Sequence, residues 1–176
     1  MTMMKDKIAA GLERTFARHG FAETDIETLR AGADVSLRTL YKYFPTREER
    51  MLAALEHRHR RYLAQITTDL PKRPEAALSI FFDRIGAWMD EETSHGCLFH
   101  AAVAAAPGNT ALRAMLARHK QEVAEALAAA INRYDVIEDL TLVIEGLTQC
   151  WPLHGQRAML SAKRLAAPLL NQPCGP

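Results

Sequence analysis

The stretch from residue 25 to residue 47, DIETLRAGADVSLRTLYKYFPTR, constrains the fold of this chain more than any other. It predicts two short helices with a tight turn between them, followed by the start of a third helix. A capping box is predicted at each end, formed by Thr24 with Glu27 and by Thr46 with Glu49. Asp34 falls in the turn, where aspartate tolerates a left-handed backbone better than most other non-glycine residues.

The second helix of this stretch, predicted over residues 37–44, has a surface suited to a polyanion. Ser36 is its expected N-cap. The apolar positions that would form a small helical core are Leu29, Ala33, Val35, Leu40 and Phe44. The outward positions carry cations, hydroxyls and aromatic rings, namely Arg38, Thr39, Tyr41, Lys42 and Tyr43. Cations meet phosphates or guanine edges and hydroxyls bond phosphate oxygens, so this helix fits a nucleic-acid groove.

The charge of the chain is unevenly placed. Residues 36–62 hold seven Lys or Arg residues and three acidic ones, although the formal net charge of the whole chain is only +1. A basic patch at one end of a near-neutral protein indicates a polyanion partner there. A solvated charged face is an equally good interpretation of the charge alone. The segment from His57 to Arg61 is interpreted as such a solvated basic face of a helix.

The rest of the chain is predicted to be helical as well. The expected helices span residues 5–19, 25–33, 37–44, 47–68, 75–89, 110–134, 136–153 and 156–170, with a further one from about residue 96. This gives an all-α fold of about nine helices. Pro152 is expected to kink or end the helix over 136–153. We expect a DNA-binding domain at 1–47, a connecting helix over 48–65, and a C-terminal helical bundle over 66–176.

Several function classes find no support in the sequence. No apolar run is long enough to span a bilayer, and the N-terminus lacks the apolar core of a secretory signal. Cys97, Cys150 and Cys174 are few and odd in number, which fits free thiols in a reducing compartment. No nucleotide-binding glycine loop and no hydrolase or metalloprotease motif occurs. We therefore expect a cytoplasmic protein that is not an enzyme, with no cofactor and no membrane partner.

Residues 5–55 resemble the DNA-binding domain of the TetR family of bacterial transcriptional regulators. The resemblance lies in F-x-x-x-G-F at residues 16–21, T-x-I-x-x-L at 24–29, A-D-V-S at 33–36, and T-L-Y-K-Y-F at 39–44. A helix start of the form Thr-Arg-Glu-Glu follows at residue 46. Two positions depart from the family pattern: Asp34 stands where glycine is usual, and Arg30 where alanine is usual. Asp34 is expected to strain the turn, and Arg30 to point outward and add a phosphate contact.

The resemblance implies that the helix over 37–44 is the recognition helix. Leu37, Arg38 and Lys42 would lie nearest to bases. The residues that would lie at the N-cap or anchor phosphates are Thr28, Ser36, Thr39, Tyr41, Tyr43 and Arg47. For Tyr43, core packing is an equal alternative to a DNA contact.

The resemblance also implies a homodimer whose C-terminal domain senses a small molecule. The function expected from it is a transcriptional regulator, a repressor released from a palindromic double-stranded operator by an apolar or amphipathic effector. Candidates for the effector pocket, each on the apolar face of its helix, are Trp88, Phe99, His100, Met115, His119 and Trp151. For His119, a satisfied core position is the alternative to a ligand contact.

The last two long helices carry more apolar surface than one small bundle covers, so a two-fold interface is predicted there. Its candidate residues are Leu140, Val143, Ile144, Leu147, Trp151, Leu160, Leu165 and Leu169. The alternative from another class is a small metal- or haem-binding protein or enzyme. It would use Cys97, His100, Cys150 and His154, whose paired spacings share a helix face.

Overall fold

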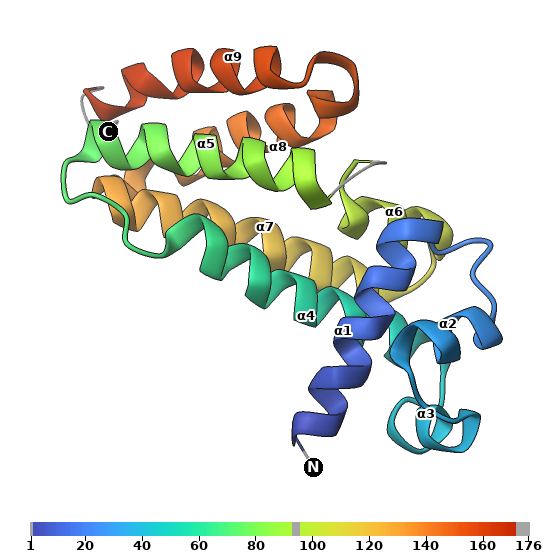
Figure 1. Ribbon diagram of the computed structural model, residues 1–176. Helices are drawn as coiled ribbons and strands as arrows, with labels where there is room; N and C mark the ends of the chain where they lie inside the picture. Colours follow the sequence, from blue (N-terminus) through green and yellow to red (C-terminus); the bar gives the residue numbers. More distant parts are fainter. Residues whose placement is uncertain (1, 93–95, 172–176) are drawn as a thin grey trace. The chain divides into compact units, whose positions relative to one another are not determined.

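The computed structural model describes residues 2–92 and 96–171, and this part of the chain is helical and contains no strand (Figure 1). The N-terminal helices are α1 (Thr2–His19), α2 (Ile26–Ala33), α3 (Leu37–Tyr43) and α4 (Arg47–Thr67). The later ones are α5 (Pro74–Glu92), α6 (Leu98–Ala105), α7 (Thr110–Ile131), α8 (Ile137–His154) and α9 (Gln156–Ala166). Short 3₁₀ helices η1 (Tyr134–Val136) and η2 (Ala167–Leu170) flank α8 and α9. The predicted all-α fold of about nine helices is confirmed.

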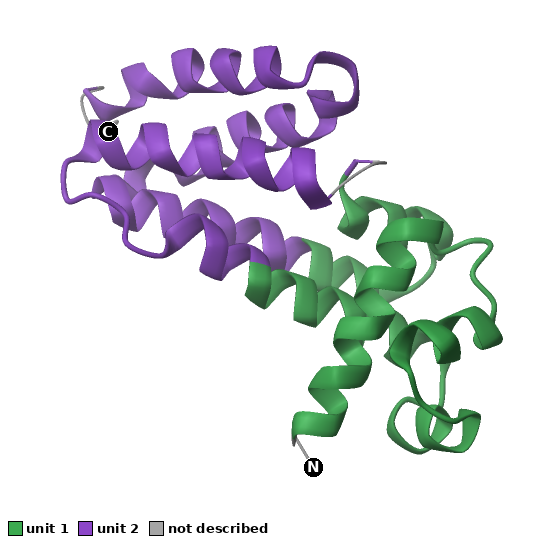
Figure 2. Ribbon diagram, viewed as in Figure 1, with its two compact units in different colours: residues 1–61, 97–116 green, residues 62–96, 117–176 purple. Residues whose placement is uncertain are grey.

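The chain folds into two compact units, which Figure 2 shows in different colours. Unit 1 comprises residues 1–61 and 97–116, and unit 2 comprises residues 62–96 and 117–176. Each unit has its own apolar core. Helices α4 and α7 contribute residues to both units, and α6 belongs with the N-terminal helices, which the sequence did not indicate. The domain limits at residues 47 and 65 stay a prediction.

In unit 1, helices α1 and α2 approach so closely that a glycine is required between them. A Cβ atom on Gly11 would lie 2.4 Å from the Cα of Ala33 and 2.6 Å from the carbonyl oxygen of Gly32. After α1, Gly20 takes a positive φ of 74°, and its N–H donates to the carbonyl of Phe16. Phe21 then folds back onto the core, and its ring stacks on that of Phe16 with the ring centroids 4.5 Å apart.

A buried ion cluster joins α1 to α4. The carboxylate of Glu13 is 1% exposed and receives Arg61 at 2.8 Å, Arg58 at 3.1 Å and the Nδ1 atom of His57 at 2.5 Å. Arg58 is itself almost fully buried, as is His59. The interpretation of residues 57–61 as a solvated basic face is therefore wrong. The acidic partner of these residues, Glu13, lies more than forty residues earlier in the chain, so a local sequence pattern could not reveal it.

Unit 2 is a bundle in which α9 packs against α5 and α8 (Figure 1). Gly86 of α5 lets this packing close, since a Cβ atom there would lie 3.3 Å from the ring of Trp151. Helix α8 continues through Pro152 to His154, and Gly155, at a φ of 47°, separates it from α9. Helix α7 stops at Ile131, short of the predicted Tyr134, because Asn132 adopts a left-handed backbone. No helix in the described ranges is long and apolar enough to cross a membrane.

Candidate nucleic-acid interface

The turn between α2 and α3 is held by the backbone and the side chain of Asp34. Asp34 has the predicted left-handed backbone, with φ 52° and ψ 55°, and its N–H donates to carbonyls at the end of α2. The ammonium group of Lys7 on α1 lies 2.9 Å from the Asp34 carboxylate. The hydrogen bond from Lys7 and its charge hold the pKa of Asp34 below its ordinary value. The turn is thereby tied to α1 as well as to α2.

The start of α2 differs from the prediction. Asp25, not Thr24, is the N-cap, and its carboxylate accepts from the backbone N–H of Thr28 at 2.7 Å. This hydrogen bond lowers the pKa of Asp25. The capping box of Thr24 with Glu27 is therefore wrong: Thr24 donates to the carbonyl of Gly20 instead. Glu27 pairs with Arg30 at 2.8 Å, so Arg30 does point outward as predicted.

Helix α3 begins and ends as its sequence predicts, within one residue. The hydroxyl of Ser36 accepts from the N–H of Thr39 at 3.1 Å, which confirms the N-cap. The capping box of Thr46 with Glu49 at the start of α4 is also confirmed, by bonds of 2.9 Å and 3.1 Å. Leu40 is fully buried and anchors α3 to the core of unit 1.

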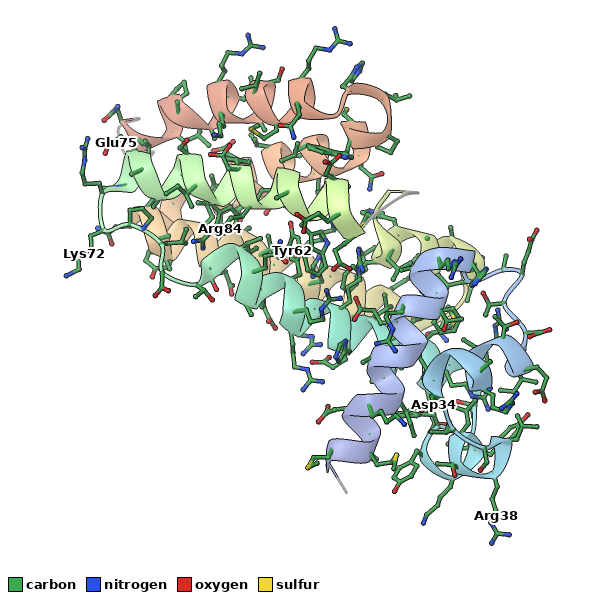
Figure 3. The ribbon with its side chains drawn as sticks, viewed as in Figure 1. Asp34, Arg38, Tyr62, Lys72, Glu75 and Arg84 are labelled. Carbon is green, nitrogen blue, oxygen red and sulfur yellow. The ribbon has the colours of Figure 1, made fainter. Side chains whose placement is uncertain are left out.

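The outer face of α3 is accessible and basic. Figure 3 shows the side chain of Arg38 extending outward from α3. Of the residues predicted to contact DNA, those that are exposed are Ser36, Arg38, Tyr41, Lys42 and Arg47. Those that are partly buried are Thr28, Leu37, Thr39 and Tyr43. The structure thus gathers the predicted set on α2, α3 and the start of α4, all within unit 1.

Arg47 has a further role that the sequence did not show. Its guanidinium donates to the carbonyl of Thr24 at 3.1 Å and to the carbonyl of Phe21. These bonds fasten the loop between α1 and α2 to the first turn of α4. Arg47 therefore helps to hold the loop that leads into α2.

Arg50 was not among the predicted residues, although it contacts Tyr41 on α3. Its guanidinium carbon sits 4.8 Å from the ring centroid of Tyr41, and its Nη2 atom donates to the carbonyl of Pro45 at 2.8 Å. An arginine three positions after Arg47 is the available signal, because that spacing places it on the same side of α4.

The candidates for an effector pocket fall into both units. Phe99, His100 and Met115 belong to unit 1, whereas Trp88, His119 and Trp151 belong to unit 2. In unit 2, the ring of Tyr62 (labelled in Figure 3) lies 5.1 Å from Trp88 and 5.3 Å from His119. All three residues are buried. Whether any of the six binds an effector stays a prediction.

The candidates for a dimer interface divide by burial within the protomer. Leu160 and Leu165 on α9 are 54% and 66% exposed, and Val143 is partly exposed. The other predicted residues are buried inside unit 2: Leu140, Ile144, Leu147, Trp151 and Leu169. Two further leucines that were not predicted are exposed on α8, Leu142 at 72% and Leu153 at 78%. A groove of about 730 Å³ runs along α8 and α9, and its lining includes Leu142, Leu160 and Leu165 but not Leu153.

The alternative of a metal or haem site gains no geometric support. Among the described residues, no three His, Cys, Asp or Glu side chains come together in a way that could hold a metal ion. Cys97 and His100 lie in unit 1, whereas Cys150 and His154 are exposed on α8 in unit 2. Cys97 and Cys150 are free thiols, as expected, and Cys174 lies outside the described residues.

Helices α1, α2 and α3, with a capped turn between α2 and α3 and an exposed basic face on α3, form the arrangement typical of a helix-turn-helix DNA-binding domain. Residues 8–54 match the family described as "Bacterial regulatory proteins, tetR family". Residues 8–54, which hold α2 and α3, therefore carry the DNA-binding domain of the TetR family. Comparison with curated protein sequences gives no match.

Solved structures share the fold over nearly the whole chain. A TetR-family regulator from Streptomyces coelicolor is 20% identical, with 97% of this chain and 95% of that chain covered and a TM-score of 0.79. A TetR regulator from Haloarcula marismortui is 18% identical, with 97% and 98% covered and a TM-score of 0.80. The multidrug binding protein EbrR, complexed with ethidium, is 24% identical, with 92% and 97% covered and a TM-score of 0.67.

Proposed function

We propose that this chain is a homodimeric repressor that binds a palindromic operator through α3 of each protomer. The observation that carries the proposal is the exposed basic face of α3, fixed by the Ser36 cap and by buried Leu40. Leu37, Arg38 and Lys42 face the bases, and Tyr41 and Tyr43 meet phosphates. A two-fold dimer places two such helices on successive half-sites of one operator.

The operator is found by selecting duplexes from a randomised library with the purified protein. On the selected duplex, Arg38→Ala or Lys42→Ala weakens binding by about 1–3 kcal/mol and relaxes sequence preference at one position. Arg73→Ala is the matched control, because Arg73 is 84% exposed in unit 2 and loses the same charge far from α3 in sequence. Selection of no sequence, or wild-type affinity in both α3 variants, refutes the proposal.

Release of the repressor requires that an effector favour a state with lower operator affinity. The support for an effector site is the buried set of Tyr62, Trp88 and His119, in which the Tyr62 ring lies beside both the Trp88 ring and the His119 imidazole. A mostly apolar site with few polar groups favours an aromatic or amphipathic molecule over a sugar. The structural likeness to EbrR, which was solved with ethidium, makes ethidium a reasonable first probe.

The effector proposal is tested by thermal shift followed by operator release. A compound that raises the melting temperature and displaces the operator supports a switch. The same compound is then expected to act weakly on Trp88→Ala, while the control variant Tyr134→Ala, altered at an exposed ring, responds as the wild type does. Stabilisation without operator release refutes the switch.

A further inference from the structure

Arg50 is a buried cation that pairs with no carboxylate in the part of the chain that the structure describes. Its side chain lies in the first turns of α4, and the residue is 5% exposed. Among the described residues no carboxylate forms an ion pair with it, and its Nε atom has no hydrogen-bond partner. Burial of an unpaired charge is unfavourable, and arginine does not escape this by losing its proton. The position therefore carries a cost that local packing does not explain.

The contacts that Arg50 does make lead to the recognition helix. Its guanidinium lies 4.8 Å from the ring centroid of Tyr41 on α3, and it donates to Pro45 in the loop between α3 and α4. Tyr41 is 49% exposed, so the ring is supported from within by Arg50 and open to solvent outside. A guanidinium on an aromatic face is a favourable arrangement, and it is stronger where the cation is desolvated.

Burial fixes little of the recognition helix. Helix α3 has seven residues, and Leu40 is the one fully buried among them. A contact that holds an exposed ring in one orientation lowers the entropy lost when that ring meets DNA. The unpaired charge of Arg50 also favours an anion at this surface.

We propose that Arg50 is a positioning residue for DNA recognition, which fixes the ring of Tyr41 on the DNA-facing side of α3. The inference rests on the proposed function, because it assigns Tyr41 to operator contact. The flat guanidinium group of Arg50 is the part that holds the ring of Tyr41. Lysine in its place keeps the charge but not the flat face that covers the ring.

The test is a double-mutant cycle on the full-length protein and a duplex selected from a randomised library. Arg50→Met is expected to weaken operator affinity about 3- to 30-fold, the range expected for a partly to fully desolvated cation–ring contact. In a Tyr41→Ala background the same change is expected to matter less than about 2-fold, because the ring is already gone. Arg50→Lys is expected to weaken binding as well, with the salt dependence of the wild type retained.

A second measurement follows the ring without DNA. Tyrosine ring resonances of the free protein are compared in wild type, Arg50→Met and Arg50→Lys, and those of Tyr41 are expected to shift and sharpen in both variants. Thermal unfolding confirms that each variant is folded, and Arg50→Lys serves alone if Arg50→Met does not fold.

The results distinguish failure of the positioning role of Arg50 from failure of operator binding. Equal losses in both backgrounds, wild-type affinity in Arg50→Lys, or an unchanged Tyr41 spectrum overturns the positioning role while operator binding stands. A wild-type protein that selects no duplex overturns the proposed function, and the positioning role with it.

Discussion

Asp34 shows how a single residue can serve a turn that glycine usually makes. Its backbone is left-handed, which costs most side chains about 1 kcal/mol or more. The carboxylate is placed where Lys7 of α1 reaches it at 2.9 Å. The side chain that makes the turn less favourable therefore also ties the turn to a second helix.

This arrangement predicts a dependence of stability on acid pH. The pKa of Asp34 is lowered below its ordinary 3.8, so its ion pair stabilises the folded protein above about pH 4. That contribution is lost as the pH falls through the lowered pKa of the folded state. Asp34→Asn keeps a residue that tolerates the left-handed backbone but removes the charge.

The measurement is thermal unfolding of wild type and Asp34→Asn at pH 7 and pH 3. We expect the wild type to melt higher at pH 7 and the difference to shrink at pH 3. A difference that grows toward acid pH would show that the Lys7 pair does not stabilise the fold.

At the scale of elements, caps are what the sequence predicts best. Ser36 and the Thr46 box lie within four residues of the atoms they bond, so their patterns are local and helix α3 was predicted to within one residue. The failure at the start of α2 is also local, because Thr24 and Asp25 are adjacent and both can cap a helix.

Packing between helices was predicted less well, because its partners are distant in sequence. Arg58 continues the buried stripe of Met51 and Leu55 on α4, and Glu13 lies beside Leu12 on the buried side of α1. A charge on each of two buried stripes is a signal for an ion pair. Its partner, however, could be named only from the structure.

The approach of α1 to α2 predicts that Gly11→Ala destabilises unit 1. Alanine normally stabilises a helix interior over glycine by about 0.5–1 kcal/mol. Here its Cβ would lie 2.4 Å from the backbone of α2, so the two helices must separate. We expect a lower urea midpoint for Gly11→Ala. An unchanged or raised midpoint would mean that α1 and α2 are less closely packed than described.

The Glu13 cluster predicts a larger loss of stability. Glu13→Gln keeps the shape of the side chain but removes the buried carboxylate charge that Arg58, itself 3% exposed, contacts at 3.1 Å. Breaking a buried pair of this kind costs about 3–5 kcal/mol. We expect the lower part of that range, because Arg61 at 37% and His57 at 20% exposure reach solvent.

A matched control exists on the same two helices. Asp6 of α1 pairs with Arg60 of α4 at 3.0 Å, but both side chains are about half exposed. Asp6→Asn should therefore cost less than about 1 kcal/mol in urea unfolding. Equal losses for Glu13→Gln and Asp6→Asn would mean that burial of the cluster adds nothing to stability.

At the scale of the whole molecule, the sequence showed that α8 and α9 are apolar but not which residues face their own bundle. Helix α8 is apolar on more than one face, so periodicity could not separate core from interface. The burial of each side chain within the protomer separates the core positions from the candidate interface positions. Leu147 packs inside unit 2, whereas Leu160 and Leu165 stay exposed. A charge at Leu147 would therefore disrupt the fold rather than test a dimer.

The final prediction is that Leu160→Glu combined with Leu165→Glu yields folded monomers that bind the operator weakly. In a free protomer these glutamates are solvated, so the bundle tolerates them. In a two-fold interface they would be buried without partners beside the α8 leucines that line the same groove. Weak binding follows because one protomer presents one recognition helix to a site with two halves.

The measurement is sedimentation at micromolar concentration, with thermal unfolding to confirm the fold and operator titration for function. Tyr134→Glu is the control, because it puts a glutamate in place of an aromatic side chain that is 61% exposed. Tyr134 lies in η1, outside α8 and α9. The control should remain dimeric. A wild type that sediments as a monomer, or a double variant that remains a dimer, would show that this face of α8 and α9 does not join two copies of the chain.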